Sequence, residues 1–277
     1  MFTYNNWDKF CSTIRKNNHC CTRAMDIISV VKKNKKFIIL KHDVETNVKK
    51  ALIFAKIEHK YKISGTFYIQ EYLLDNPKNI KILNQIKQLG HEVAYHYDIM
   101  DSNGGDWQKA TSEFIINIEK FKKFGFKIKT ICPHGNPVMI RNGWSSNKDF
   151  FRNEKIKNQF NKIIDIVINF HQEIIKEYLY ISDTGYNWQL ITNIANDDQK
   201  NSKPNKKINN LEGVIRLTNN QNSLIISIHP HRWSKYTLIM EMRILMFKIV
   251  KNCIKFIAKN NSIKKILNKF YYLAKKI

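Results

Sequence analysis

Short apolar runs alternate with stretches of helical spacing along most of this chain. The runs that fit strands cover residues 37–40, 65–69, 92–95, 126–131, 178–181 and 224–228. The first of them has no polar residue within it, which is typical of a strand buried in a parallel sheet. Between the runs, apolar residues recur at helical spacing, as Val48, Ala51 and Ala55 do. This alternation predicts βα units around a parallel sheet.

Local signals indicate where some of these elements begin and end. Thr46 or Asn47 is expected to cap the helix after the first strand, and Pro77 is expected in the first turn of the next helix. Gly90 falls where that helix should end. Residues 163–170 fit either a helix or a strand, and the stretch 193–210, rich in Asn, Asp and Lys, is expected to be a surface loop.

The chain divides into three parts on this pattern. Residues 1–36 are expected to form a helical lead-in, residues 37–236 a distorted (β/α) barrel, and residues 237–277 a basic helical extension. Charged residues interrupt the extension too often for it to span a bilayer. It is expected either to pack against the barrel or to make peripheral contact with an anionic membrane surface.

Composition indicates a globular protein with a large excess of positive charge. The 277 residues are 43% hydrophobic and carry 47 Lys and Arg against 23 Asp and Glu, a formal net charge of +24. The lysines are scattered rather than clustered on one helix, so the charge favours solubility over specific nucleic-acid recognition. The five cysteines lack C-x-x-C spacing, which disfavours a disulfide framework or a zinc knuckle. Since the first residues do not resemble a secretory signal, we expect a cytoplasmic protein.

Ionisable side chains collect where the expected strands end. His42, Asp43 and Glu45 follow the first strand, and helix capping explains at most one of them. Other strand ends carry further imidazoles and carboxylates, namely His96, Asp98, His134, Asp183, His229 and His231. Because the carboxyl ends of parallel strands meet on one face, we expect these groups to converge. Imidazole and carboxylate together are a common ligand set for a hydrolytic zinc or similar divalent metal.

The order of these motifs resembles that of the polysaccharide deacetylase superfamily. The matching segments are His42-Asp43-Val44-Glu45, residues 90–98, His134-Gly135, Asp183-Thr184-Gly185 with Trp188, and His229-Pro230-x-Arg232-Trp233. They cover roughly residues 37–235 and are most similar to a divergent branch of the carbohydrate-esterase deacetylases with an HDVD-like first motif. The resemblance implies a distorted (β/α) barrel in which a divalent metal, zinc being the expected ion, assists removal of N-acetyl groups from sugars.

Carried over residue by residue, the resemblance makes Asp43 the general base, Glu45 and His96 metal ligands, and His229 the general acid. In the expected hydrolysis of an acetamide, Asp43 takes a proton from water and His229 protonates the departing amine. Trp188 or Trp233 offers either a flat surface for a sugar ring or a part of the core. Further residues expected to contact the substrate or to orient these groups are His42, Asp98, Asp183, Trp188, His231, Arg232 and Trp233.

The sequence departs from the family pattern in all three of the first motifs. Val44 separates the two carboxylates of the first motif, and Met100 stands where the second motif has another histidine. The third motif lacks its arginine. We therefore predict that His134 or Asp98 supplies the third metal ligand, with His134 preferred because it replaces one imidazole by another.

Two other functions stay open on the sequence. Met100 favours a degenerate deacetylase that binds a glycan or glycolipid without hydrolysing it, and metal analysis separates that protein from the enzyme. The net charge favours a nucleic-acid-binding protein, against which the carboxylates at the strand ends argue. The sequence identifies neither the sugar nor its carrier.

Overall fold

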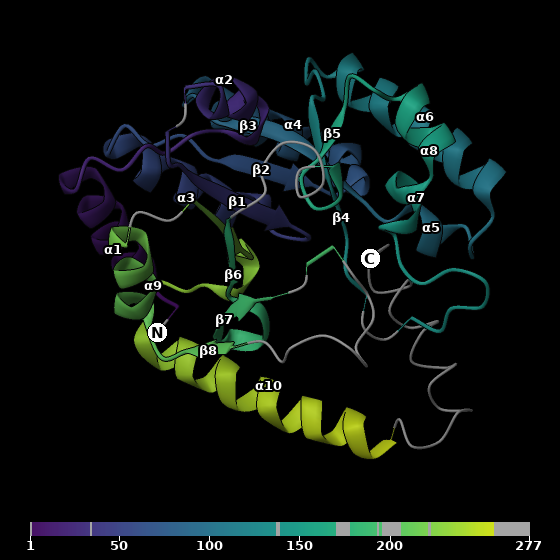
Figure 1. Ribbon diagram of the computed structural model, residues 1–277. Helices are drawn as coiled ribbons and strands as arrows, with labels where there is room; N and C mark the ends of the chain where they lie inside the picture. The colour runs from purple at the N-terminus through teal and green to yellow at the C-terminus, as the bar shows by residue number, and fades with distance from the viewer. Residues whose placement is uncertain are drawn as a thin grey trace.

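The computed structural model describes residues 2–33, 35–136, 139–169, 178–192, 194–195, 206–220 and 223–257 (Figure 1). Its strands form one nine-stranded sheet in the order β5-β4-β3-β2-β1-β9-β6-β7-β8. The strands are β1 Ile38–Val44, β2 Thr66–Ile69, β3 Glu92–Tyr97, β4 Thr130–Pro133, β5 Ile164–Asp165, β6 Leu179–Ser182, β7 Trp188–Ile191, β8 Lys206–Ile208 and β9 Leu224–Ile228.

Helices connect most of these strands and lie outside the sheet (Figure 1). The α-helices are α1 Tyr4–Lys16, α2 Ile27–Val31, α3 Val48–Lys60, α4 Pro77–Gln88, α5 Ile99–Ser102, α6 Trp107–Lys123, α7 Asp149–Arg152, α8 Glu154–Gln159, α9 Leu211–Asn219 and α10 Thr237–Ile257. Short 3-10 turns are η1 Ala24–Asp26, η2 Glu71–Asp75, η4 Thr184–Tyr186 and η5 Pro230–Arg232.

Strand β1 lies at the middle of the sheet and is parallel to both of its neighbours, β2 and β9. The sheet stays parallel through β3, β4 and β5 on one side and through β6 on the other, after which β7 and β8 run antiparallel. The predicted α/β class and barrel-like arrangement are confirmed. The sheet does not close, because no pairing joins β5 to β8 within the described residues.

Several predicted boundaries are corrected by the structure. Strand β1 continues to Val44, so His42 and Asp43 lie within it rather than after it, whereas β4 begins only at Thr130. The expected loop 193–210 contains β8, and residues 193 and 196–205 of that stretch lie outside the described residues. These elements depend on pairing with a neighbouring strand, which local apolar patterning does not report.

The predicted helix signals act as expected around α3 and α4. The side chain of Asn47 caps α3 by accepting a hydrogen bond from the backbone N–H of Lys50 at 3.1 Å. Pro77 occupies the first turn of α4, where its missing N–H removes no helical hydrogen bond. Gly90 follows α4 with φ of +91°, a conformation that other residues adopt only with strain.

The residues expected as a helical lead-in contain α1, η1 and α2, and α1 is part of the core. Trp7, Phe10 and Ile14 repeat at helical spacing and are buried. The indole N–H of Trp7 donates to Oε1 of Glu58 in α3 at 3.1 Å. This segment therefore covers the outer face of β1 and α3.

Candidate metal centre and active site

The two-residue period of β1 sends its polar side chains to opposite faces of the sheet. Lys41 and Asp43 point to the inner face, where both contact Ser227 of β9. His42 points to the outer face, where it stacks on Phe67 with ring centroids 4.1 Å apart. The structure therefore does not bring His42 to the other predicted site residues.

Glu45, His96 and His134 come together although they lie at the ends of three different strands. Glu45 follows β1, His96 lies in β3, and His134 follows β4. One potential ligand atom from each lies within 4.8 Å of the other two. Oε1 of Glu45 is 3.4 Å from Nε2 of His134, and the rings of His96 and His134 are 5.1 Å apart. This donor set of one carboxylate and two imidazoles fits zinc or a similar divalent ion.

The surroundings of His96 prepare it to act as a ligand. Its Nδ1 lies 3.0 Å from the backbone oxygen of Cys132, which can only accept, so Nδ1 carries the proton and Nε2 keeps its lone pair. Burial lowers the pKa of His96 to about 4, against the opposing effect of Asp43. The imidazole is therefore neutral at pH 7, as metal binding requires.

A second group of potential ligands, Asp43, His96 and Cys132, lies beside the first. Burial raises the pKa of the Cys132 thiol, so the thiolate that binds metals is disfavoured there. Asp43 is already engaged by a buried cation, Lys41. The set of Glu45, His96 and His134 is the better metal site.

Lys41 makes an ion pair that sequence reasoning missed. Its Nζ lies 2.5 Å from each oxygen of Asp43, and Lys41 is 2% exposed. Burial opposes ionisation of both groups, but their attraction dominates: it holds the pKa of Lys41 well above and that of Asp43 below the usual range. Lys41 is therefore a permanent cation and not a nucleophilic amine. The sequence did carry a signal of this pair, because Lys41 directly follows the apolar run 37–40 and stands two residues before Asp43, on the same face of a strand.

His229 is held in place by Asp183. Its Nδ1 lies 2.5 Å from Oδ1 of Asp183, and its backbone N–H donates to Oδ2 of the same carboxylate at 3.0 Å. Burial opposes the charge on Asp183, but His229 lowers the pKa of this carboxyl below its usual value. The other ring nitrogen, Nε2, points toward the centre, 3.7 Å from Asp43 Oδ2 and 3.9 Å from Glu45 Oε1.

Trp188 and Trp233, the two tryptophans predicted near the site, belong to the core and not to a sugar-binding surface. Trp233 is fully buried and donates its indole N–H to Asp183 at 2.8 Å. Trp188 is 3% exposed and packs against Phe2, with ring centroids 5.5 Å apart. The expectation that either ring stacks on a sugar is corrected, because neither face is accessible.

The remaining predicted residues lie at varying distances from the centre. Nε2 of His231 is 3.9 Å from Glu45 Oε2, so this half-buried ring borders the centre. Arg232 Nη1 lies 3.7 Å from Asp183 Oδ1 and reaches the centre only through that carboxylate. Asp98 precedes α5 and belongs to neither group of potential ligands found among the described residues.

A buried hydrogen-bond network around Asn147 holds the backbone of His134 in place. Asn147 donates its side-chain N–H to the backbone oxygen of His134 at 2.9 Å and to Asp101 at 3.0 Å. Its Oδ1 accepts from the backbone N–H of Met100 and of Asp101 at 3.1 and 3.0 Å. Met100 itself is fully buried. Nothing in the sequence around Asn147 or around Asp101, which lies in α5, indicated this role.

The buried histidines predict how stability depends on pH. Burial lowers the pKa of both His96 and His231 from 6.5 to about 4. Between these pH values the unfolded chain binds protons that the folded chain excludes, so the free energy of unfolding falls as pH falls from 6.5 to 4. Urea unfolding of chelator-treated protein across this range measures the slope. The variant His231→Asn is expected to show a shallower slope, and an unchanged slope would contradict the assignment.

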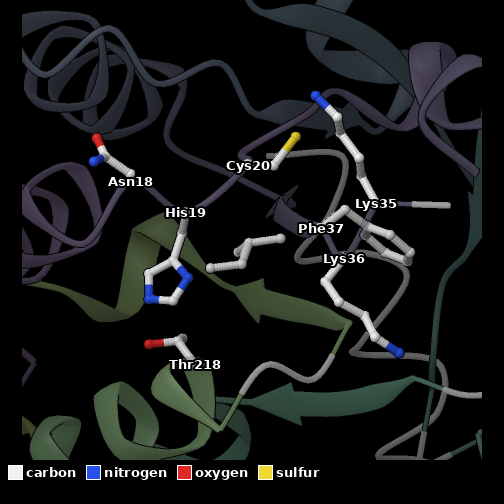
Figure 2. A pocket seen from close by; sticks show the side chains of 8 residues that line it. Asn18, His19, Cys20, Lys35, Lys36, Phe37 and Thr218 are labelled. Atoms are coloured by element: carbon white, nitrogen blue, oxygen red, sulfur yellow. The ribbon is translucent and has the colours of Figure 1, made fainter. Parts of the chain in front are cut away.

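A cavity of about 360 Å³ lies away from this centre (Figure 2). Its lining includes Phe37 and Ile38, where β1 begins, whereas Asp43 lies near the other end of that strand. Active sites of parallel sheets form at the carboxyl ends of the strands. The residues around the cavity are Asn18, His19, Cys20, Lys35, Lys36, Phe37, Ile38 and Thr218.

Comparisons with known proteins give matches among solved structures only. No family model and no curated protein matches the sequence. A family 4 carbohydrate esterase from Streptomyces lividans, solved in complex with acetate, matches with 14% identity and a TM-score of 0.42, over 78% of this chain and 89% of that chain. A CE4 esterase from Streptococcus mutans matches with 14% identity and a TM-score of 0.45, over 84% of this chain and 89% of that chain.

A CE4 family pseudoenzyme from Bacillus anthracis also matches, with 15% identity and a TM-score of 0.38, over 78% of this chain and 61% of that chain. The family of these structures is the one that the motifs of this chain resemble. The matches are similarities at low identity, so the function proposed below rests on the residues of the centre.

Proposed function

We propose that this protein is a metal-dependent hydrolase that removes the acetyl group from an N-acetylated sugar or glycan. The observation that carries the proposal is the grouping of Glu45, His96 and His134 within 4.8 Å, beside Asp43 and His229. A metal-ligand set bordered by a carboxylate and an oriented imidazole provides the groups that amide hydrolysis requires.

Glu45, His96 and His134 would hold the cation. A divalent ion bound there supplies Lewis-acid polarisation of the acetamide carbonyl and lowers the pKa of water. Glu45 is suited to this place because His134 and the other imidazoles overcome the effect of burial and hold its pKa well below the usual range. The carboxylate is therefore held in its ionised form, the form that binds a cation.

Asp43 is the general base in this proposal. Its Oδ2 lies 3.7 Å from Nε2 of His229, so one reacting group beside the pair can contact both atoms. The ion pair with Lys41 fixes the orientation of the carboxylate and at the same time weakens its basicity. The proton that Asp43 accepts comes from the attacking water.

His229 is the general acid. In the imidazolium form of His229 that acts as the acid, Asp183 accepts from Nδ1, and the proton to be transferred sits on Nε2, the atom that faces the centre. This arrangement, in which a buried carboxylate orients an imidazole, lets His229 protonate the amine as the C–N bond breaks. The sugar amine and acetate are the products.

The proposal is tested by metal content and acetate release together. Purified protein is expected to contain about one divalent ion per chain and to release acetate from oligomers of N-acetylglucosamine. Chelation is expected to abolish release, and added zinc to restore it. His134→Asn is expected to lose both metal and activity, whereas His59→Asn, at an exposed site in α3, is expected to keep both. Acetate release by metal-free His134→Asn at the parent rate would exclude the proposed site.

A second candidate is a protein that binds the same sugars without hydrolysing them. The observation that favours it is Lys41, which occupies both oxygens of the carboxylate assigned as base. This candidate would be established over the enzyme if the protein binds about one divalent ion per chain and binds the sugar, but releases no acetate with any metal tested.

A further inference from the structure

Helix α10 presents a row of large apolar side chains to solvent. Leu238, Met242 and Leu245 are 69%, 60% and 59% exposed, and Ile249 continues the row at 49%. Their spacing of four, three and four residues places them on one face of the helix. Exposed apolar rows of this kind mark interaction surfaces, because single scattered apolar residues are the norm elsewhere.

The opposite face of α10 is already used for packing. Met240 is fully buried, and Ile244 packs against the core. Phe247 meets Tyr186 of η4 edge to face, with ring centroids 5.2 Å apart. The helix therefore has apolar residues on two faces, of which the protein covers one. Figure 1 shows α10 at the outer edge of the molecule, on the side of β7 and β8.

The charges along this segment are almost all positive. Arg243 and Lys248 are exposed on α10, with Glu241 as the single acidic residue of the helix. From residue 237 to 277 the sequence has ten Lys and Arg and one Glu. An exposed apolar row in a strongly basic segment matches an anionic bilayer, whose headgroups attract cations and whose interior accepts the apolar side chains.

We propose that α10 docks on the surface of an anionic membrane and lies in the plane of the headgroups. The row of Leu238, Met242, Leu245 and Ile249 enters the bilayer to a depth of about 5–10 Å, as interfacial helices do. Lys248, beside the row, meets the lipid phosphates, and the other cations of the segment add to the attraction. No helix in the described part of the chain is both long and apolar enough to cross a membrane.

A second copy of this chain fits the same surface less well. A two-fold interface would pair each row with itself and bring two strongly basic segments together. Like charges at such an interface repel, whereas anionic lipid neutralises them. The charge of the segment thus decides between the two occupants.

Flotation of the full-length protein with vesicles tests the proposal. We expect binding to vesicles of phosphatidylcholine and phosphatidylserine in equal parts, at least about tenfold weaker binding to phosphatidylcholine alone, and loss of binding at high salt. Equal binding to both vesicles, or none to either, would overturn the proposal.

Two variants separate the apolar row from the charges. The triple variant Leu238→Ser, Met242→Ser, Leu245→Ser is expected to weaken binding at least about tenfold, because each side chain loses its transfer into the bilayer. Arg243→Glu with Lys248→Glu is expected to do the same on anionic vesicles and to have no effect on neutral ones. Both should keep the parent thermal unfolding temperature, since the changed residues are exposed.

Sedimentation of the parent and the triple variant distinguishes the other occupant. A concentration-dependent dimer that the triple variant loses, in a protein that does not float with anionic vesicles, would show that the row binds a second copy and would refute membrane docking. These measurements need no catalytic activity, so their outcome is independent of the proposed hydrolysis.

Discussion

Replacing Asp43 by Asn is expected to lower the rate of acetate release by about 10²- to 10⁴-fold, the usual contribution of a general base. The amide cannot take a proton from water, while Glu45, His96 and His134 still form the metal site. The metal content should therefore equal that of the parent protein. Steady-state kinetics with metal analysis of the same sample measure both quantities.

This substitution also removes the partner of Lys41, which would leave a buried ammonium group without its counter-charge. Breaking a buried ion pair from one side typically costs about 3–5 kcal/mol. The matched control is therefore the double variant Lys41→Met, Asp43→Asn, in which both charges are absent. It is expected to recover stability while acetate release stays lost, since an ion pair replaced by groups of similar volume is often nearly neutral.

The two variants together separate catalysis from folding. If the stable double variant releases acetate at the parent rate, Asp43 is not the base. Lys41→Met removes the cation that weakens the basicity of Asp43. A higher activity of its folded fraction would show that Lys41 lowers the reactivity of the base.

The second large effect concerns stability and lies on the outer face of β1. Replacing Glu58 by Ala is expected to lower the free energy of unfolding by about 3–5 kcal/mol, the cost of removing one member of a buried polar network. Glu58 is fully buried, with Oε1 located 2.8 Å from His42 Nε2 and 3.1 Å from Trp7 Nε1. Without the carboxylate the indole N–H of Trp7 loses its acceptor, and His42 loses the buried acidic group beside it. Urea unfolding at pH 7 measures the change.

Glu119→Ala is the matched control, because that carboxylate is 61% exposed on α6 and its loss should change stability by less than about 0.5 kcal/mol. The folded fraction of Glu58→Ala should keep its metal, since the network lies behind the strand that carries Asp43. A loss of stability no larger than that of Glu119→Ala would show that the network is not coupled to folding.

The network explains why His42, which we expected to contact the substrate or to orient the catalytic groups, lies away from the site. His42 stands next to Asp43 in a motif that resembles a deacetylase, yet it contacts Glu58, Phe67 and Trp7. Gly65 closes the same space: a Cβ there would lie 2.9 Å from Glu58 Oε2 and 3.0 Å from the backbone oxygen of Leu40. The alternation of β1 places His42 on this face, and no rule about motif composition would reveal it.

The sequence by itself determined the strands that form the middle of the sheet and the groups at their carboxyl ends. Apolar patterning located β1, β3 and β9 because these strands are buried by the whole sheet, and their alternation with helices gave the parallel arrangement. The proximity of Glu45, His96 and His134 followed, since parallel strands end on one face.

Only the tertiary structure decided which side chains face one another. The orientation of His229 by Asp183 and the burial of Trp188 and Trp233 depend on contacts between residues far apart in sequence. The ion pair of Lys41 with Asp43 depends on the burial of the inner face of β1, to which both side chains point. The edge strand β8 and the open sheet depend likewise on neighbouring chain segments. Local sequence determines which segments form helices and strands, but the energy of a buried charge depends on the groups that the fold places beside it.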